Sequence, residues 1–235
     1  MSERSERPVE ASDDGLAKIT PARVDAAQAV SDLVHALVGT VTDDETLGEI
    51  SALAREAGAR LDGAGPRVRT VPDFETVKAL RDAGEDTTFL TMGDRPVAGP
   101  ANPTAVRVEP RWDDDGTAYA DVWFGPAFEA APGRVHGGMV AAVFDDILGM
   151  AMARVRSPGF TGRLTVHYRA PVPMNQRIEF KAWGEEPDGR KLVVQSEARL
   201  DGRLLAEAEA LFILVDPDHF ATHADDLPVR GDEHT

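Results

Sequence analysis

Two adjacent carboxylates, Asp145 and Asp146, interrupt a segment from Gly137 to Ala153 that has no other charge. Burying an ionised carboxylate is costly unless it is paired or hydrogen-bonded, so at least one of them is expected to serve chemistry or a polar interface. Adjacent helical residues lie about 100° apart around the axis, so the two side chains should have different surroundings. A carboxylate beside a bound carbonyl group could activate water or attack the carbonyl directly, and both routes stay open. The simpler alternative is that both aspartates lie on an exposed strip.

The start of the same segment, Val135-His136-Gly137-Gly138, could stabilise a developing negative charge. Glycines let a ligand approach the backbone closely, and the first amide N–H groups of a helix are unpaired donors at the positive end of its dipole. We therefore expect an oxyanion site for a carbonyl oxygen, formed by Gly138 with Gly137 as a second candidate. The alternative is a close-packed turn that only begins the helix.

Short alternating segments on both sides of this helix predict strands. They cover residues 104–112 and 117–125 before the helix and 163–172, 176–184, 191–200 and 203–215 after it. Asp201-Gly202 is a strong signal for a two-residue hairpin turn. Two strands, one long apolar helix and four strands predict an α+β fold in which the helix packs on one face of an antiparallel sheet.

The N-terminal part of the chain is expected to be helical. Thr20-Pro21 begins one apolar-periodic segment that ends at Gly39, and the capping-box sequence from Thr42 to Glu45 begins another that continues to Leu61. Together they predict a helical hairpin, and residues 74–84 form a weaker helical piece. The expected division is a flexible tail (1–19), a helical extension (20–100), the sheet-and-helix domain (101–216) and a flexible acidic tail (217–235).

Composition excludes several kinds of site. The 235 residues include no cysteine, which rules out disulfides, thiolate zinc sites and cysteine nucleophiles. The net charge of −16 opposes binding to nucleic acid or to anionic lipid. No apolar run approaches the roughly 18 residues of a membrane helix, and the first residues lack the apolar stretch of a secretory signal. We expect a cytoplasmic protein with no membrane or nucleic-acid partner.

The segment VHGGMVAAVFDDILGMAMA resembles the hot-dog-fold acyl-CoA thioesterases of the PaaI-like group, and especially their THEM4-like branch. In that family the HGG motif precedes a helix with an acidic residue nine positions after the histidine, which here is Asp145. The segments FGPAFEAAPGR, TGRLTVHYRAPVP and DGRKLVV resemble family motifs in the same order, so that the resemblance covers about residues 100–215. It implies a hot-dog fold, with an antiparallel sheet wrapped around a long central helix, and hydrolysis of an acyl-CoA to the free acid and CoA.

The resemblance also implies roles for individual residues. Asp145 would be the general base or nucleophile, and Asp146 would be secondary. His136 would line the thioester site, and Thr161 would position the base or its water. Phosphates of CoA would bind basic side chains, for which the candidates are Arg190 and Lys191 in the DGRK turn, with Arg163 and Arg169 behind them. A purely structural role is the alternative for each, and no metal or redox cofactor is expected.

The family assembles as homodimers with one continuous sheet, or as dimers of dimers, with active sites at the subunit interface. Asp145 and Gly138 would then serve one site from different subunits. A hydratase of the same fold is disfavoured, because the chain lacks a D-x-N-P-x-H segment. A non-catalytic module that binds acyl-CoA, or a protein partner through its helical extension, is the alternative of a different class. Saturable acyl-CoA binding without release of thiol would distinguish it.

Overall fold

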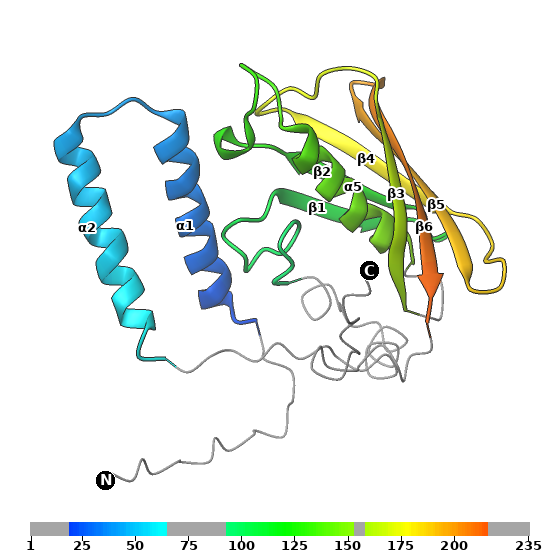
Figure 1. Ribbon diagram of the computed structural model, residues 1–235, viewed down its shortest axis with the longest axis horizontal. Helices are drawn as coiled ribbons and strands as arrows, with labels where there is room; N and C mark the ends of the chain where they lie inside the picture. The colour runs from blue at the N-terminus through cyan, green and yellow to red at the C-terminus, as the bar shows by residue number, and fades with distance from the viewer. Residues whose placement is uncertain (1–18, 65–92, 153–157, 216–235) are drawn as a thin grey trace, which may run out of the picture. The chain divides into compact units, whose positions relative to one another are not determined.

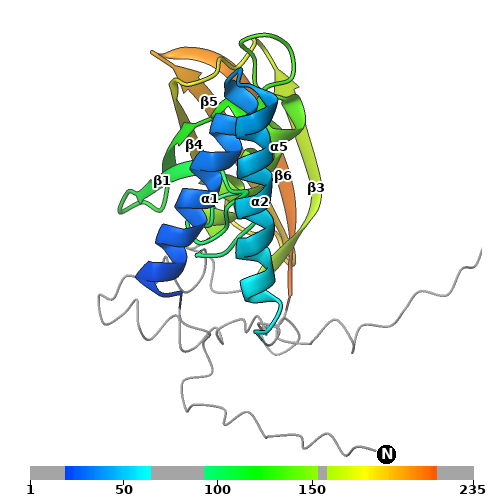
Figure 2. The ribbon, with the colours of Figure 1, turned by 90° about the vertical axis from the view of Figure 1, so that its left-hand side faces the viewer.

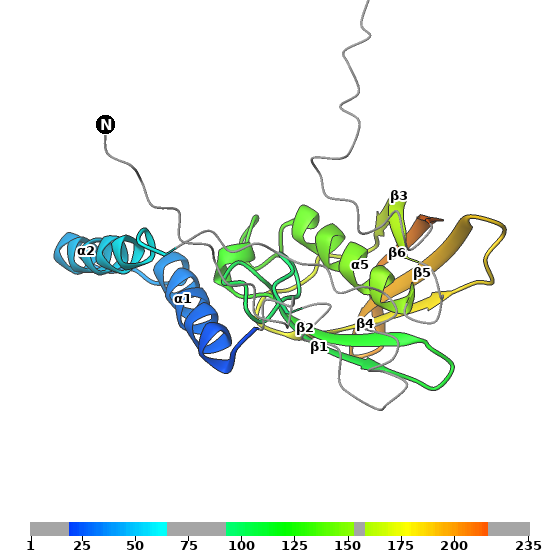
Figure 3. The same cartoon turned by 90° about the horizontal axis from the view of Figure 1, so that it is seen from below.

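The computed structural model describes residues 19–64, 93–152 and 158–215. The helices within these ranges are α1 (Pro21–Gly39), α2 (Asp44–Leu61) and α5 (Gly137–Ala151), together with the short 3-10 helix η1 (Pro126–Phe128). The strands are β1 (Arg107–Trp112), β2 (Ala118–Trp123), β3 (Gly159–Tyr168), β4 (Arg177–Gly184), β5 (Lys191–Leu200) and β6 (Arg203–Leu214). They form one antiparallel sheet in the order β1-β2-β4-β5-β6-β3, and α5 lies on one face of it (Figures 1 and 3). The predicted α+β architecture is confirmed.

The core lies between α5 and the inner face of the sheet. Every second residue of β2 and β4 is buried, as a half-covered antiparallel sheet requires. Phe144 of α5 meets Phe180 of β4 edge-on, with ring centroids 5.0 Å apart. Complete burial of one such side chain stabilises the fold by about 1.5–3 kcal/mol. The α5 side chains that are fully buried are Val140, Val143, Phe144, Ile147 and Leu148.

The two N-terminal helices belong to different compact units. Helix α1 belongs to the unit that contains the sheet, whereas α2 belongs to the other unit. Both are continuous helices (Figure 2). No helix among the described residues has the length and apolar character that a membrane crossing requires. The predicted helical piece at 74–84 and nearly all of both predicted tails lie outside the described residues.

Several element boundaries differ from the sequence prediction, and strand β1, for example, begins at Arg107 instead of residue 104. Helix α2 is capped by Asp43 and not by Thr42, because the Asp43 carboxylate accepts a hydrogen bond of 2.8 Å from the Thr46 N–H. Strand β3 begins at Gly159, four residues before the predicted start, and ends at Tyr168. The hairpin turn after β5 is confirmed, since Asp201 and Gly202 both have positive φ, as a type I′ turn requires.

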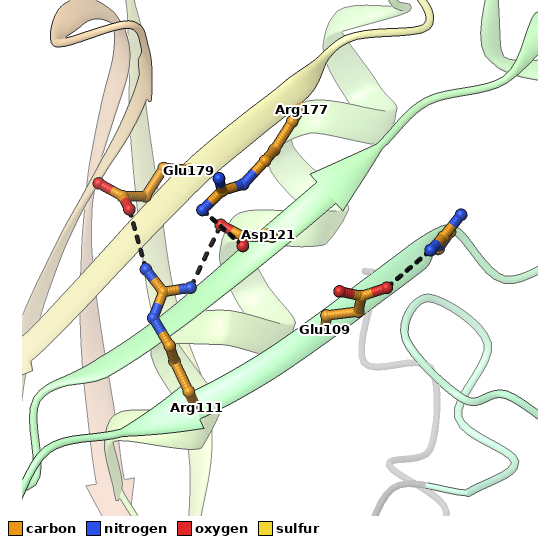
Figure 4. Close-up of polar contacts among 6 residues, drawn as sticks. Glu109, Arg111, Asp121, Arg177 and Glu179 are labelled. Atoms are coloured by element: carbon orange, nitrogen blue, oxygen red, sulfur yellow. Dashed lines mark hydrogen bonds and ion pairs between the residues drawn. The ribbon is translucent and has the colours of Figure 1, made fainter.

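An ion-pair network covers the outer face of β1, β2 and β4 (Figure 4). The register places the carboxylates of Glu109, Asp121 and Glu179 side by side on three neighbouring strands. Like charges in this arrangement repel one another. Arg111 bridges Asp121 and Glu179, at 3.2 and 2.8 Å, and Arg177 contacts Asp121 at 2.7 Å. The arginines convert a repulsive row of carboxylates into an attractive network.

We expect Asp121→Asn to lower the free energy of unfolding at pH 7 by about 1–2 kcal/mol, because it removes a charged acceptor from two arginines. Burial raises the pKa of Asp121, but hydrogen bonds and charge from Arg177 and Arg111 outweigh it, so that the net pKa lies below its ordinary 3.8. The stabilisation is therefore present above pH 3.8 and is lost as the pH falls through the lowered value. Urea unfolding at pH 7 and pH 3 measures this, with exposed Glu109→Gln as the control. An equal loss in both variants would contradict the prediction.

Candidate active site

The first turn of α5 is held by the imidazole of His136. His136 is the N-cap residue, and its Nδ1 accepts a hydrogen bond of 3.0 Å from the Gly138 N–H. The carbonyl of His136 accepts from the Met139 N–H at 2.9 Å. The Gly137 N–H donates to no acceptor among the described residues. Gly137, more than the first-choice candidate Gly138, therefore carries the available amide donor.

Two contacts that the sequence did not reveal fix this turn from either side. The Tyr168 hydroxyl, at the end of β3, donates to the Gly137 carbonyl at 2.7 Å. The His136 N–H donates to the Phe128 carbonyl of η1 at 2.8 Å. Nothing in the sequence indicated the Tyr168 contact, because Tyr168 and Gly137 are 31 residues apart in the chain.

A cleft of about 420 Å³ opens beside Gly137. Its walls are mostly small or apolar, and the two basic residues among them are Arg134 and Arg169. Arg134 was not among the sequence candidates, although it lies two residues before His136. The lining is Ala130, Ala131, Arg134, Val135, Gly137, Val140, Tyr168, Arg169, Ala170, Pro171 and Val172.

Asp145 points out of α5 toward β3. Its Oδ1 accepts a hydrogen bond of 2.9 Å from the Thr161 hydroxyl. This contact depends on a β-bulge, because the register against β6 shifts between Thr161 and Arg163 and leaves Gly162 as the extra residue. A bulge reverses the alternation of side chains, so that Thr161 and Leu164 both face α5. The structure thus brings together two of the predicted site residues.

Asp146 points in a different direction, as the helical geometry predicted. Its side chain is only 16% exposed and lies 3.7 Å from the Arg95 guanidinium. Its Oδ2 atom is buried and accepts no hydrogen bond from the described residues. Asp146 therefore attaches α5 to the segment around Arg95 and does not face the same surface as Asp145.

The predicted cations are not gathered at one place. Arg163 pairs with Glu209 at 3.3 Å, and Arg169 pairs with Glu207 beside the cleft. Arg190 donates to the Leu214 carbonyl at 3.2 Å, next to Lys191 in the β4–β5 turn. Leu214, which Arg190 contacts, pairs with Gly159 at the start of β3, whereas Gly137 contacts Tyr168 at its other end. Arg190 and Gly137 therefore lie at opposite ends of a strand about 30 Å long. Among the described residues no three His, Asp or Glu side chains are grouped as metal ligands.

Residues 132–207 match the model of a known family, described as the thioesterase superfamily. This part of the chain is a thioesterase superfamily domain. The predicted hot-dog fold is thereby confirmed for the domain, with α5 as its central helix. The match covers α5 and the first residues of β6, and so includes Asp145, Thr161 and the HGG turn.

Named relatives of the thioesterase domain agree with this assignment. The chain is 34% identical over 95 residues to acyl-coenzyme A thioesterase THEM4 of Xenopus laevis, covering 40% of this chain and 43% of the relative. It is 30% identical over 100 residues to THEM4 of Bos taurus, covering 42% and 41%. The chain therefore matches less than half the length of these relatives.

A solved structure extends the similarity beyond the thioesterase domain. The crystal structure of a thioesterase superfamily protein, RHA08564, is 26% identical with a TM-score of 0.69, and the match covers 81% of this chain and 94% of that one. The sheet and α5 make up about half of this chain, so the match must also include part of the N-terminal region.

Asp146→Asn should raise the free energy of unfolding at pH 7. Burial raises the pKa of Asp146 above its ordinary 3.8, the Arg95 charge opposes this, and the Asp145 charge adds to it. Because the folded state holds the proton more tightly, wild-type stability falls as the pH rises from 3.8 through the raised value. The amide avoids this loss, so the two proteins should be equally stable below pH 3.8.

Denaturant unfolding at pH 3.5 and pH 7 measures the difference, with the exposed substitution Asp114→Asn in the β1–β2 turn as the control. A less stable Asp146→Asn at pH 7 would mean that the Arg95 ion pair outweighs the cost of burial.

Proposed function

We propose that this protein hydrolyses acyl-CoA thioesters to the free acid and CoA. The observation that carries the proposal is the Asp145 carboxylate, held by the Thr161 hydroxyl on the helix of a thioesterase superfamily domain. The relatives' printed name, acyl-coenzyme A thioesterase, supports the choice of substrate. The cleft beside Gly137 has mostly small or apolar walls that suit an acyl chain, and its two arginines, Arg134 and Arg169, suit an anionic part of the ligand.

In the proposed reaction the thioester oxygen accepts a hydrogen bond from the Gly137 N–H. That amide lies at the positive end of α5, where negative charge on the oxygen is stabilised as the carbonyl is attacked. Asp145 takes a proton from water, the resulting hydroxide bonds to the carbonyl carbon, and the C–S bond then breaks to release the CoA thiolate. The proton on Asp145 then passes to the thiolate, which regenerates the carboxylate. Thr161 holds the carboxylate in position throughout.

Direct attack by Asp145 is the second route, through an acyl-aspartyl anhydride. Label found in Asp145 after a single turnover in ¹⁸O-labelled water would establish this route. Water that attacks the thioester, or the acyl carbonyl of the anhydride, carries the label into the product acid instead. Water that attacks the aspartyl carbonyl of the anhydride leaves the label in Asp145.

The proposed site requires two copies of the chain. Gly137 and Asp145 are eight residues apart on α5, or about 12 Å along the axis. The oxyanion donor must lie about 3 Å from the carbonyl oxygen, and the base must lie about 3 Å from the water that attacks the same carbonyl carbon. We therefore assign Asp145 and the Gly137 N–H of one site to different subunits of a homodimer. Strand β3 is at the end of the sheet, so that two copies can pair there and remove an exposed edge.

Asp145→Asn should lower kcat/KM for acyl-CoA hydrolysis at least about a hundredfold, or about 2.7 kcal/mol of barrier, because the amide can neither take the proton nor attack. Thr161→Val should lower it about tenfold, because the carboxylate loses a single hydrogen bond. Free-thiol release from short, long and aryl acyl-CoAs measures both effects, with size-exclusion chromatography to verify the oligomer. A wild type that binds these ligands saturably and releases no thiol would favour the non-catalytic binding module.

Mixed dimers test whether the site is shared. Gly137→Pro removes the proposed donor, while proline suits the first position of a helix and the extended backbone of His136 (φ −60°, ψ 127°) suits a residue before proline. Gly137→Ala keeps the donor, and its Cβ would have ordinary contacts of 3.5 Å with Tyr168.

A dimer of one Asp145→Asn chain and one Gly137→Pro chain has one intact site only if the two groups come from different subunits. Random mixing of the two inactive variants should then restore about a quarter of wild-type activity, since about half of the dimers are mixed and each has one good site. Mixing with Gly137→Ala is the positive control. No recovery after confirmed subunit exchange would contradict the shared site.

A further inference from the structure

Helix α1 contacts the thioesterase domain through His35, among other residues. The His35 Nδ1 accepts a hydrogen bond of 3.1 Å from the Ala127 N–H of η1. The His35 ring also meets the Phe128 ring edge-on, with centroids 5.2 Å apart and an interplanar angle of 70°. Both elements belong to the same compact unit. His35 thus supplies a polar and an apolar contact to the same short turn.

The fit between α1 and η1 is close enough to require a glycine on each side. A Cβ on Gly125 would lie 2.6 Å from the His35 Nδ1. A Cβ on Gly39 would lie 2.9 Å from the Pro126 Cγ. Distances below 3.0 Å are not tolerated without movement. The two elements are therefore shaped for each other at this end of α1.

Much of the apolar surface of α1 is exposed. Ala27 is the buried residue of the helix and Val24 is half-buried, whereas five other large apolar side chains are between 40% and 59% exposed. These exposed side chains are Val30, Leu33, Val34, Leu37 and Val38. A helix with so little buried surface is held mainly by its specific contacts, so His35 should have a disproportionate effect on where η1 lies.

A chain of hydrogen bonds connects His35 to the proposed oxyanion donor. The Ala127 N–H donates to His35, and the next residue, Phe128, accepts from the His136 N–H at 2.8 Å. His136 then accepts from the Gly138 N–H through its side chain. The Gly137 N–H lies between the two amides that this chain fixes.

We propose that α1 is part of the catalytic unit and that His35 is a positioning residue for the α5 N-terminus. His35 fixes η1, the Phe128 carbonyl fixes His136, and His136 fixes the direction of the Gly137 N–H. The inference rests on the proposed thioesterase function. It assigns a role to a helix outside the residues that match the family model.

Two substitutions separate the contributions of the histidine. His35→Asn keeps an acceptor near the position of Nδ1 but loses the ring, whereas His35→Phe keeps the ring and loses the acceptor. A misplaced donor should slow the chemical step more than substrate binding. We expect His35→Phe to lower kcat about tenfold with KM changed less than about twofold, and His35→Asn to retain kcat within about threefold. Asp32→Asn, an exposed change on the same helix, is the control.

Hydrogen–deuterium exchange of the segment from Gly125 to Val140 gives a readout independent of activity. Exchange there should increase in His35→Phe and remain near wild type in His35→Asn. If the wild type releases no thiol, the proposed function fails, and the exchange result still decides whether His35 positions the α5 N-terminus. A His35→Phe variant with lower thermal stability but unchanged kcat and exchange would overturn the proposal.

Gly125→Ala provides a second approach that does not alter the histidine. Its Cβ collides with the His35 ring, so the variant should show the low kcat and raised exchange of His35→Phe. In a His35→Ala background the space is free, and Gly125→Ala should add less than about a twofold change in kcat. Additive effects in the double variant would mean that Gly125 acts without His35 and would overturn the proposal.

Discussion

The burial of α5 against the inner face of the sheet determines the geometry of everything else in the domain. Five of its side chains, Val140, Val143, Phe144, Ile147 and Leu148, are fully buried, which fixes the rotation of the helix about its axis. With the rotation fixed, the directions of Asp145 and Asp146 follow from the helical repeat. Rotation by a single residue would bring a carboxylate into the core, at a cost of several kcal/mol. The core therefore orients the proposed catalytic group as effectively as any direct contact.

The bulge at Gly162 is the second constraint, since it determines what Asp145 meets. In a regular β3, Thr161 would face outward on the same side as Arg163, and Asp145 would have no hydroxyl opposite it. The extra residue reverses Thr161 toward α5. Glycine suits the position, because a Cβ there would lie only 3.0 Å from the Ile213 Cγ1. A local irregularity in the sheet thus completes a contact that the helix alone could not make.

Local patterns in the sequence were sufficient for the element order, the helix boundaries of α1 and the Asp201-Gly202 turn. Those features depend on neighbouring residues, which a linear pattern records. The cap of α2 was wrong by one residue, because Thr42 and Asp43 are both good caps and adjacent. The bulge, the Tyr168 contact and the His35 contact join residues far apart in the chain, so no spacing revealed them. Gly162 lay just before the predicted strand at 163–172, so even a glycine within a strand, the usual hint of a bulge, was not available.

The roles of the HGG residues were harder to predict than their presence. A helix N-terminus has several unpaired amides, and the choice among them depends on the rotamer of the capping side chain. Because the cap is His136 itself, its imidazole engages the Gly138 N–H and leaves the Gly137 N–H available. The same histidine receives its own backbone contact from η1, which α1 contacts through His35. Whether the Gly137 N–H is available therefore depends on contacts among α1, η1 and α5, which local sequence patterns do not record.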